Sequence, residues 1–200
     1  MQADYYHTIE KTSVAEYKDR GSKFIAFAFP IASPNEFKEK LAAIKKEHPK
    51  ASHHCFAYRL GTDGNTFRVS DDGEPSGTAG KPILGQIDSK QVTDILIIVV
   101  RYFGGTLLGV PGLIHAYKTA AAMALQLIPI IHKPVMIRYR VQFDYTKMNE
   151  MMRIIKQYNC VVGKQEAQLF CNMEIAVPRI KMNEALFKLK EIKGIEITAI

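Results

Sequence analysis

The sequence predicts an α+β protein of two domains, on three observations. Residues 136–200 change hydrophobic periodicity in the order β-α-β-β-α-β, the split βαβ, ferredoxin-like arrangement. The apolar, β-branched run Ile95–Val100 is typical of a buried strand, and helical spacing follows it after a glycine-rich loop. Lys133-Pro134 separates the two patterns. We therefore expect domains over residues 1–134 and 135–200.

The elements before the buried strand follow from local signals. Tyr5–Lys18 has the pattern of a strand pair, and Phe24–Ile31 alternates apolar residues on both faces, which indicates a strand covered on both sides. Ser33-Pro34 supplies an N-cap and a first helical residue for a helix that runs to about Glu47. Ser52–Leu60 and Thr66–Val69 indicate two more strands.

The remaining elements flank the two glycine-rich loops. Thr78–Ile87 indicates a short helix entered from the first loop. A second helix begins after Gly112 and ends near Leu127, because a proline follows. Ile130–Val135 has the pattern of a connector, and in the second domain Cys160–Gln165 and Ala167–Val177 indicate antiparallel strands.

Composition limits the function classes. The 200 residues carry a net charge of +7, spread over both halves, which is typical of a protein with an acidic partner, nucleic acid first among them. The alternative is a soluble protein with a solvated lysine face. The three cysteines, Cys55, Cys160 and Cys171, have no metal-binding spacing and indicate a reduced cytoplasm. No signal peptide and no membrane-spanning run is evident, so we expect a soluble, cytoplasmic protein.

One loop gathers acidic residues. Asp71, Asp72 and Glu74 put three carboxylates within four residues, a pattern that could hold Mg²⁺ or supply acid–base chemistry. The alternative is a turn in which Asp71 caps a neighbouring helix. The strand before it carries His53-His54-Cys55, but only His53 and Cys55 share a face, so no metal site is predicted there.

The glycine-rich loops are candidate anion sites. Gly77–Lys81 is no Walker A motif, because a proline follows the lysine, yet its small residues would let a ligand approach the backbone. Gly104–Gly112, beside Arg101 and a helix start, favours phosphate, and its alternative is close helix–sheet packing. Tyr102 and Phe103 point to opposite faces, so one of them is available to stack on a base.

These motifs resemble the YigZ/IMPACT family over essentially the whole chain. The resemblance rests on three segments: His53-His54-Cys55-x-Ala57-Tyr58, SDDGEPSGTAGKP and VVRYFGGTLLGxxGLIHAY. It departs at Val110-Pro111, where the family pattern has a small residue and glycine, and the proline removes a backbone N–H.

The resemblance implies both folds. The first domain would have the ribosomal-protein-5 domain-2-like α/β fold, shared with domain IV of elongation factor G, ribonuclease PH and the GHMP kinases. The second would be ferredoxin-like and similar to domain V of elongation factor G. Eukaryotic members of the family act as translational regulators, and bacterial members have no settled activity.

Together these features predict a translation-linked regulatory protein that binds RNA, the ribosome or a translation-associated partner, without established catalysis. The alternative is a Mg²⁺-dependent enzyme acting on phosphates or nucleotides through Asp71, Asp72 and Glu74. A third hypothesis is a protein-interaction module. The candidate binding residues are Lys23, His53, His54, Gly77, Thr78, Gly80, Lys81, Arg101, Tyr102, Gly104, Gly105, Gly109, Gly112 and Tyr117.

Overall fold

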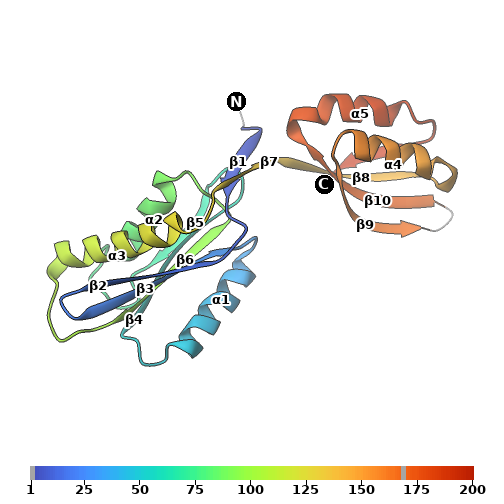
Figure 1. Cartoon of the computed structure of the whole chain (residues 1–200). Coiled ribbons are helices and arrows are strands. Elements are labelled where there is room, and N and C mark those ends of the chain that lie inside the picture. Colours follow the sequence, from blue (N-terminus) through green and yellow to red (C-terminus); the bar gives the residue numbers. More distant parts are fainter. Residues whose placement is uncertain (1–2, 168–169) are drawn as a thin grey trace. The chain divides into compact units, whose positions relative to one another are not determined.

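A computed structural model describes residues 3–167 and 170–200, which fall into two compact units (Figure 1). Tyr6–Lys133 forms one unit, and the described residues of Pro134–Ile200 form the other together with residues 3–5. Both units contain helices and strands, so the chain is a mixed α/β protein. No helix among the described residues is long and apolar enough to cross a membrane.

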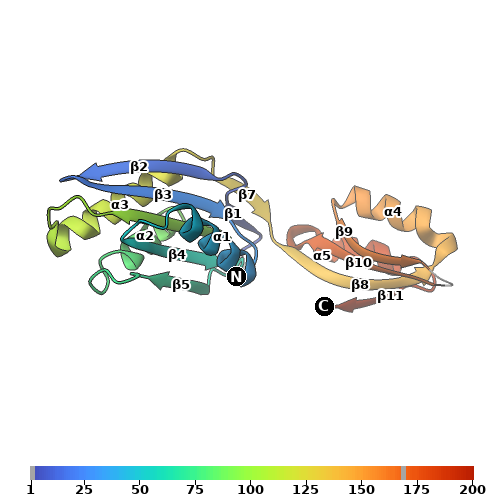
Figure 2. The same ribbon diagram turned by 90° about the horizontal axis from the view of Figure 1, so that it is seen from below.

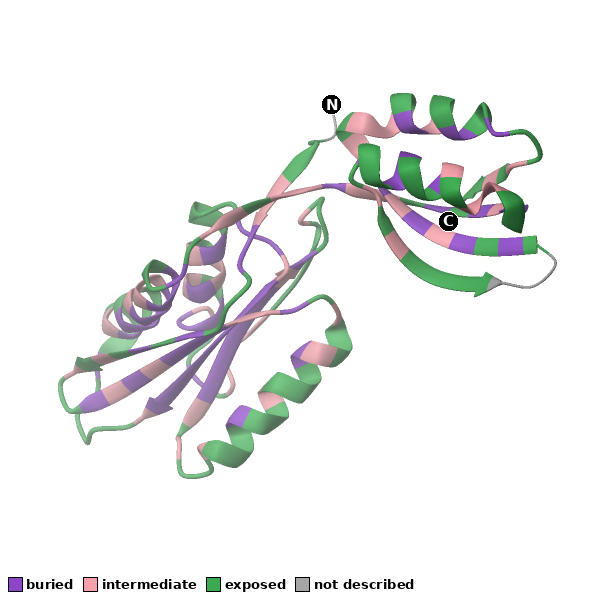
Figure 3. Cartoon of the chain, turned by 45° about the vertical axis from the view of Figure 1, so that its right-hand side comes forward, coloured by how far each residue is buried: buried purple, intermediate pink, exposed green. Residues whose placement is uncertain are grey.

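The first unit is built on a five-stranded antiparallel sheet with the strand order β2-β3-β6-β4-β5. The predicted buried strand is β6, which lies at the centre of this sheet. Figure 3 shows the buried residues concentrated on the central strands. The bounds are β2 Ser13–Asp19, β3 Ser22–Pro30, β4 His53–Leu60, β5 Thr66–Ser70 and β6 Ile95–Tyr102.

Helices cover both faces of this sheet, α1 (Pro34–Glu47) on one face and α2 (Gly80–Ser89) with α3 (Gly109–Gln126) on the other (Figures 1 and 2). Alternate residues of β6 enter the two cores, so the strand is apolar throughout. The prediction that the β3 segment is covered on both sides is confirmed. So is the N-cap of α1, where the Ser33 hydroxyl accepts the Glu36 N–H at 3.3 Å.

Two predictions about this unit are wrong. The strand pair expected over Tyr5–Lys18 does not form, because β1 (Tyr5–Thr8) pairs with β7 (Ile131–Pro134) and β2 pairs with β3. Residues 130–135, expected as a connector, therefore contain a strand. Periodicity indicates that a segment is extended but not which distant segment pairs with it.

The start of α3 also differs from the prediction. The helix begins at Gly109 rather than after Gly112, and Pro111 lies in its first turn. Proline is tolerated there, since the first N–H groups of a helix have no partner within the helix.

The second unit has the predicted order β-α-β-β-α-β. Its sheet has the antiparallel order β11-β8-β10-β9, with the core between one sheet face and the two helices. Residues 168–169, within the predicted strand Ala167–Val177, lie outside the described residues. The bounds are β8 Met136–Asp144, α4 Met148–Gln157, β9 Val161–Ala167, β10 Phe170–Pro178, α5 Met182–Lys190 and β11 Glu196–Ala199.

Candidate functional site

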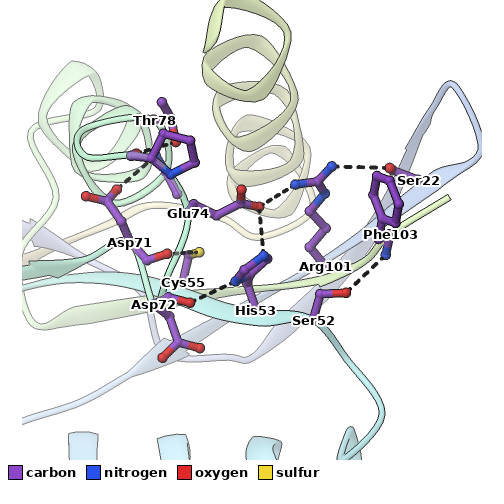
Figure 4. A network of polar contacts seen from close by, with 12 residues as sticks. Ser22, Ser52, His53, Cys55, Asp71, Asp72, Glu74, Thr78, Arg101 and Phe103 are labelled. Atoms are coloured by element: carbon purple, nitrogen blue, oxygen red, sulfur yellow. Dashed lines mark hydrogen bonds and ion pairs between the residues drawn. The ribbon is translucent and has the colours of Figure 1, made fainter. Parts of the chain in front are cut away.

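The acidic loop that follows β5 lies at the end of the sheet where β4 begins and β6 ends (Figure 4). His53 on β4 is the cross-strand neighbour of Arg101 on β6. Asp72 and Gly73 have positive φ angles of 43° and 90°, which turn the chain sharply. This turn sends the three predicted carboxylates in different directions.

Asp71 caps helix α2. Its carboxylate oxygens accept the backbone N–H groups of Gly77, Ala79 and Gly80 at 2.8–3.0 Å. Burial acts to raise the pKa of this carboxyl, but the three N–H donors outweigh it and hold the pKa below its ordinary value. The capping alternative therefore describes Asp71, whose charge is matched by the start of the helix.

Asp72 holds the beginning of β4. Its Oδ2 accepts the backbone N–H of His54 at 2.7 Å, and its Oδ1 lies 3.6 Å from the Lys45 ammonium group. His54 is itself buried, and its ring Nε2 lies 3.1 Å from the His48 carbonyl oxygen. Burial lowers the pKa of His54, so this candidate binding residue is an internal group.

Glu74 is buried beneath the loop. Its Oε1 accepts from the Arg101 guanidinium at 2.6 Å and from the Tyr117 hydroxyl at 2.7 Å. The three carboxylates thus contact three separate sets of donors. Among residues 3–167 and 170–200, no group of three or more His, Cys, Asp or Glu side chains is placed to hold a metal ion.

Tyr117 and Cys55 complete the buried network. The Cys55 thiol lies 3.3 Å from the Tyr117 oxygen and 3.0 Å from the Asp71 carbonyl oxygen. Burial raises the pKa of both Cys55 and Tyr117, so the thiol and the phenol stay protonated. Neither group is presented to a ligand at the surface.

His53 borders the same network. Its Nδ1 lies 2.8 Å from the Asp72 carbonyl oxygen, which can only accept, so Nδ1 carries the proton. Its Nε2 lies 3.8 Å from Oε1 of Glu74. The His53 side chain is 24% exposed, more than the side chains of Glu74 and Arg101.

Arg101, predicted to face a bound phosphate, is instead only 5% exposed. Besides Glu74 it contacts the Ser22 hydroxyl at 3.5 Å, and the Phe24 and Phe103 rings lie 5.5 and 5.6 Å from its guanidinium carbon. Its Nε is buried without a hydrogen-bond partner among the described residues. The Arg101 guanidinium is therefore paired with the buried Glu74 carboxylate.

Three of the candidate glycines are packing positions. A Cβ at Gly104 would lie 1.8 Å from the Gly21 carbonyl carbon, and one at Gly80 would lie 2.8 Å from the Ser70 nitrogen. A Cβ at Gly112 would meet the Leu108 Cβ at 3.0 Å. Gly80 thus lets α2 approach β5. In the second loop, however, Gly104 packs against the turn between β2 and β3, and Gly112 packs against the start of its own helix, so the helix–sheet alternative does not describe them.

The other candidate glycines, Gly77, Gly105 and Gly109, have positive φ angles of 79°, 86° and 71°. Such angles favour glycine, since a Cβ clashes with the following carbonyl. Thr78 between the first loop and α2 is buried and donates its hydroxyl to the Pro75 carbonyl at 2.6 Å. These residues shape the loops from within.

The aromatic and lysine candidates differ in how far they reach solvent. Phe103 is 49% exposed, whereas the Tyr102 hydroxyl lies 2.8 Å from the His48 ring. Phe103, not Tyr102, is thus the aromatic residue available for stacking. Lys23 pairs with Glu16 at 2.6 Å, and Lys81 is exposed.

Comparison with known proteins identifies the family. Residues 20–125 match the Impact N-terminal domain. The chain is 34% identical over 182 residues to IMPACT family member YigZ of Escherichia coli K12, covering 90% of this chain and 88% of that protein. The chain belongs to the IMPACT family. The predicted resemblance is confirmed.

Two further members of the IMPACT family match over shorter stretches. IMPACT family member YvyE of Bacillus subtilis is 33% identical over 76% of this chain and 70% of its own length. Protein IMPACT of Bos taurus is 36% identical over 96 residues, which cover 46% of this chain and 30% of the bovine protein. A crystal structure described only as that of a hypothetical protein is 30% identical, with a TM-score of 0.80, over 99% of this chain and 98% of that one.

Sequence reasoning missed two parts of this IMPACT-family site. Ser22 holds both the Arg101 guanidinium and the Gly104 N–H, at 3.5 and 3.2 Å. The second part is the contact between Cys55 and Tyr117, because a strand pattern does not show which distant side chain meets the thiol. Strand alternation could have placed Cys55 and Arg101 on the α3 face of the sheet, because both occupy odd positions of strands whose odd residues enter that core.

Proposed function

We propose that this IMPACT-family protein is a translation-linked regulatory protein that binds RNA or the ribosome. The observation that supports RNA binding most directly is the half-exposed Phe103 ring in the loop that leads from β6 to the uncapped start of α3. The helix has no side-chain cap and no acidic residue in its first turn, so its free N–H groups favour a phosphate. An exposed aromatic ring in the same loop favours a stacked, unpaired base.

The pair of units supports the same proposal. The strand order β11-β8-β10-β9 in a β-α-β-β-α-β unit supports the ferredoxin-like assignment, and hence the likeness to domain V of elongation factor G. We assign the first unit to the ribosomal-protein-5 domain-2-like fold by the same family resemblance. A translation-linked role implies a cytoplasmic protein, and the net charge of +7 favours an RNA-containing partner.

Catalysis is not part of this proposal, because Asp71, Asp72 and Glu74 each hold internal donors. Mg²⁺ enters it only as an ion carried by the bound RNA. Binding measured with and without Mg²⁺ tests that point. An RNA affinity that requires the ion would favour Mg²⁺ binding by the acidic loop.

The test is the fluorescence anisotropy of a labelled single-stranded RNA at about 100 mM salt. We expect measurable binding, and we expect the logarithm of the association constant to fall linearly with the logarithm of the salt concentration. Phe103→Leu keeps an apolar side chain but removes the stacking face, so it should weaken binding about fivefold or more. No measurable affinity, or affinity without a salt slope, would contradict the proposal.

The matched control is Phe67→Leu. Phe67 is 54% exposed and also lies beside an arginine, since the Arg59 guanidinium carbon is 5.2 Å from its ring. It pairs with Arg59 near the end of β4, whereas the acidic loop lies at the start of that strand. This variant should bind RNA like the unmodified protein. Equal losses in both variants would indicate a general effect of exposed aromatic residues rather than a site at Phe103.

A further inference from the structure

An aliphatic stripe, defined as Leu107, Val110 and Ile114, is exposed at the start of α3. These side chains are 81%, 51% and 38% exposed, while Leu108 and Leu113 between them are buried in the core. Val110 and Ile114 are four residues apart on one helix face, and Leu107 lies in the loop just before the helix. The core is therefore closed without the stripe, whose apolar surface is left to solvent.

Along the chain, the residues around the stripe carry no negative charge. The sequence from Ile95 to Phe143 contains no aspartate or glutamate. On α3 itself, Lys118 is exposed one turn after Ile114. The uncapped helix start adds partial positive charge. A ligand complementary to this surface must combine apolar side chains with negative charge.

We propose that the aliphatic stripe is a docking surface for an acidic amphipathic helix of a protein partner. Such a helix would lay leucine-like side chains on Leu107, Val110 and Ile114 and direct carboxylates toward Lys118. Aliphatic side chains offer no face for base stacking, so the stripe itself is not an RNA surface. A symmetric contact with a second copy would bring the same cations together, which disfavours self-association.

This proposal does not depend on RNA binding, and its test uses a different probe. The probe is a labelled helical peptide of about 15 residues with leucines at i, i+3, i+4 and i+7 and glutamates elsewhere. Its counterpart replaces every glutamate by lysine. Binding of each peptide to the full chain is followed by fluorescence anisotropy, and vesicles of anionic lipid and single-stranded RNA are measured beside them.

We expect the acidic peptide to bind and the basic peptide not to bind. Val110→Ser combined with Leu107→Ser should weaken the acidic peptide at least about tenfold. Lys118→Glu should weaken it in low salt and less so in high salt. The matched control is Leu127→Ser, since Leu127 is 64% exposed at the other end of α3, and it should leave binding unchanged.

Several outcomes would overturn the proposal. Equal binding of both peptides, or equal losses in the stripe and Leu127 variants, would show non-specific apolar attachment. Stripe-dependent binding of vesicles but not of the acidic peptide would identify a membrane contact instead. RNA binding that is lost in the stripe variants while the peptide never binds would assign the stripe to RNA, whereas loss of RNA binding in Phe103→Leu alone bears only on the proposed function.

Discussion

Replacing Glu74 by glutamine tests whether the buried ion pair holds the acidic loop on the sheet. The side chains of Glu74 and Arg101 are only 3% and 6% exposed, and one carboxylate oxygen accepts from both Arg101 and Tyr117. Glutamine keeps the shape and can still accept hydrogen bonds, but it leaves the guanidinium buried without a counter-charge. Breaking a buried pair in this way costs about 3–5 kcal/mol, and we expect the lower end because the amide retains an acceptor.

Urea unfolding of the full chain, followed on the transition of the first unit, measures the effect. With a slope of about 2 kcal/mol per molar urea, a loss of about 3 kcal/mol lowers the midpoint by roughly 1.5 M. Arg101→Met and the double variant complete a double-mutant cycle. We expect the double variant to be more stable than the sum of the single losses predicts by at least about 2 kcal/mol. Additive losses, or a loss below about 1 kcal/mol for Glu74→Gln, would refute the role of the pair.

Three further predictions follow from local geometry. Gly104→Ala should destabilise the first unit by about 3 kcal/mol or more, since its Cβ would lie 1.8 Å from backbone. Gly105→Ala has no atom within 4 Å of its Cβ and should cost only about 1–2 kcal/mol, because its φ is positive. Thermal unfolding compares the two variants. The lowered pKa of Asp71 means that its stabilisation is complete above about pH 4 and disappears as the pH falls through the folded value, so Asp71→Asn should be less stable at pH 7 and approach the parent below about pH 4. Burial raises the pKa of both Cys55 and Cys160, and a thiol reagent should modify the half-buried Cys160 well before the fully buried Cys55; equal rates would contradict the buried network.

Much of the fold could be predicted because its signals are local. The continuous apolar run of β6 identified a strand covered on both faces, and Ser33-Pro34 fixed the start of α1. The pairing of β1 with β7 could not be predicted in the same way. The two strands lie more than 120 residues apart, and nothing within Tyr5–Thr8 specifies Ile131–Pro134 as its partner.

The site was harder to predict because partners from distant elements redefine each residue. Asp71, Asp72 and Glu74 are close in sequence, but the positive φ at Asp72 separates them, so one caps a helix, one holds a strand and one is buried. Arg101 at a strand end before two glycines has the pattern of a phosphate ligand. Only the fold brings Glu74 over it and cancels its charge.

These pairings divide the end of the sheet into two layers with different roles. The inner layer, Glu74 with Arg101 and Tyr117, is buried and mutually satisfied, so it serves stability. The outer layer contains Phe103 and the aliphatic stripe, whose apolar surface contributes nothing to the core. Glu74→Gln should therefore lower the stability, while the fraction that remains folded binds RNA normally. Phe103→Leu should weaken RNA binding and leave the stability unchanged. A Glu74→Gln protein that is fully stable yet unable to bind RNA would place the functional group in the inner layer and invert this assignment.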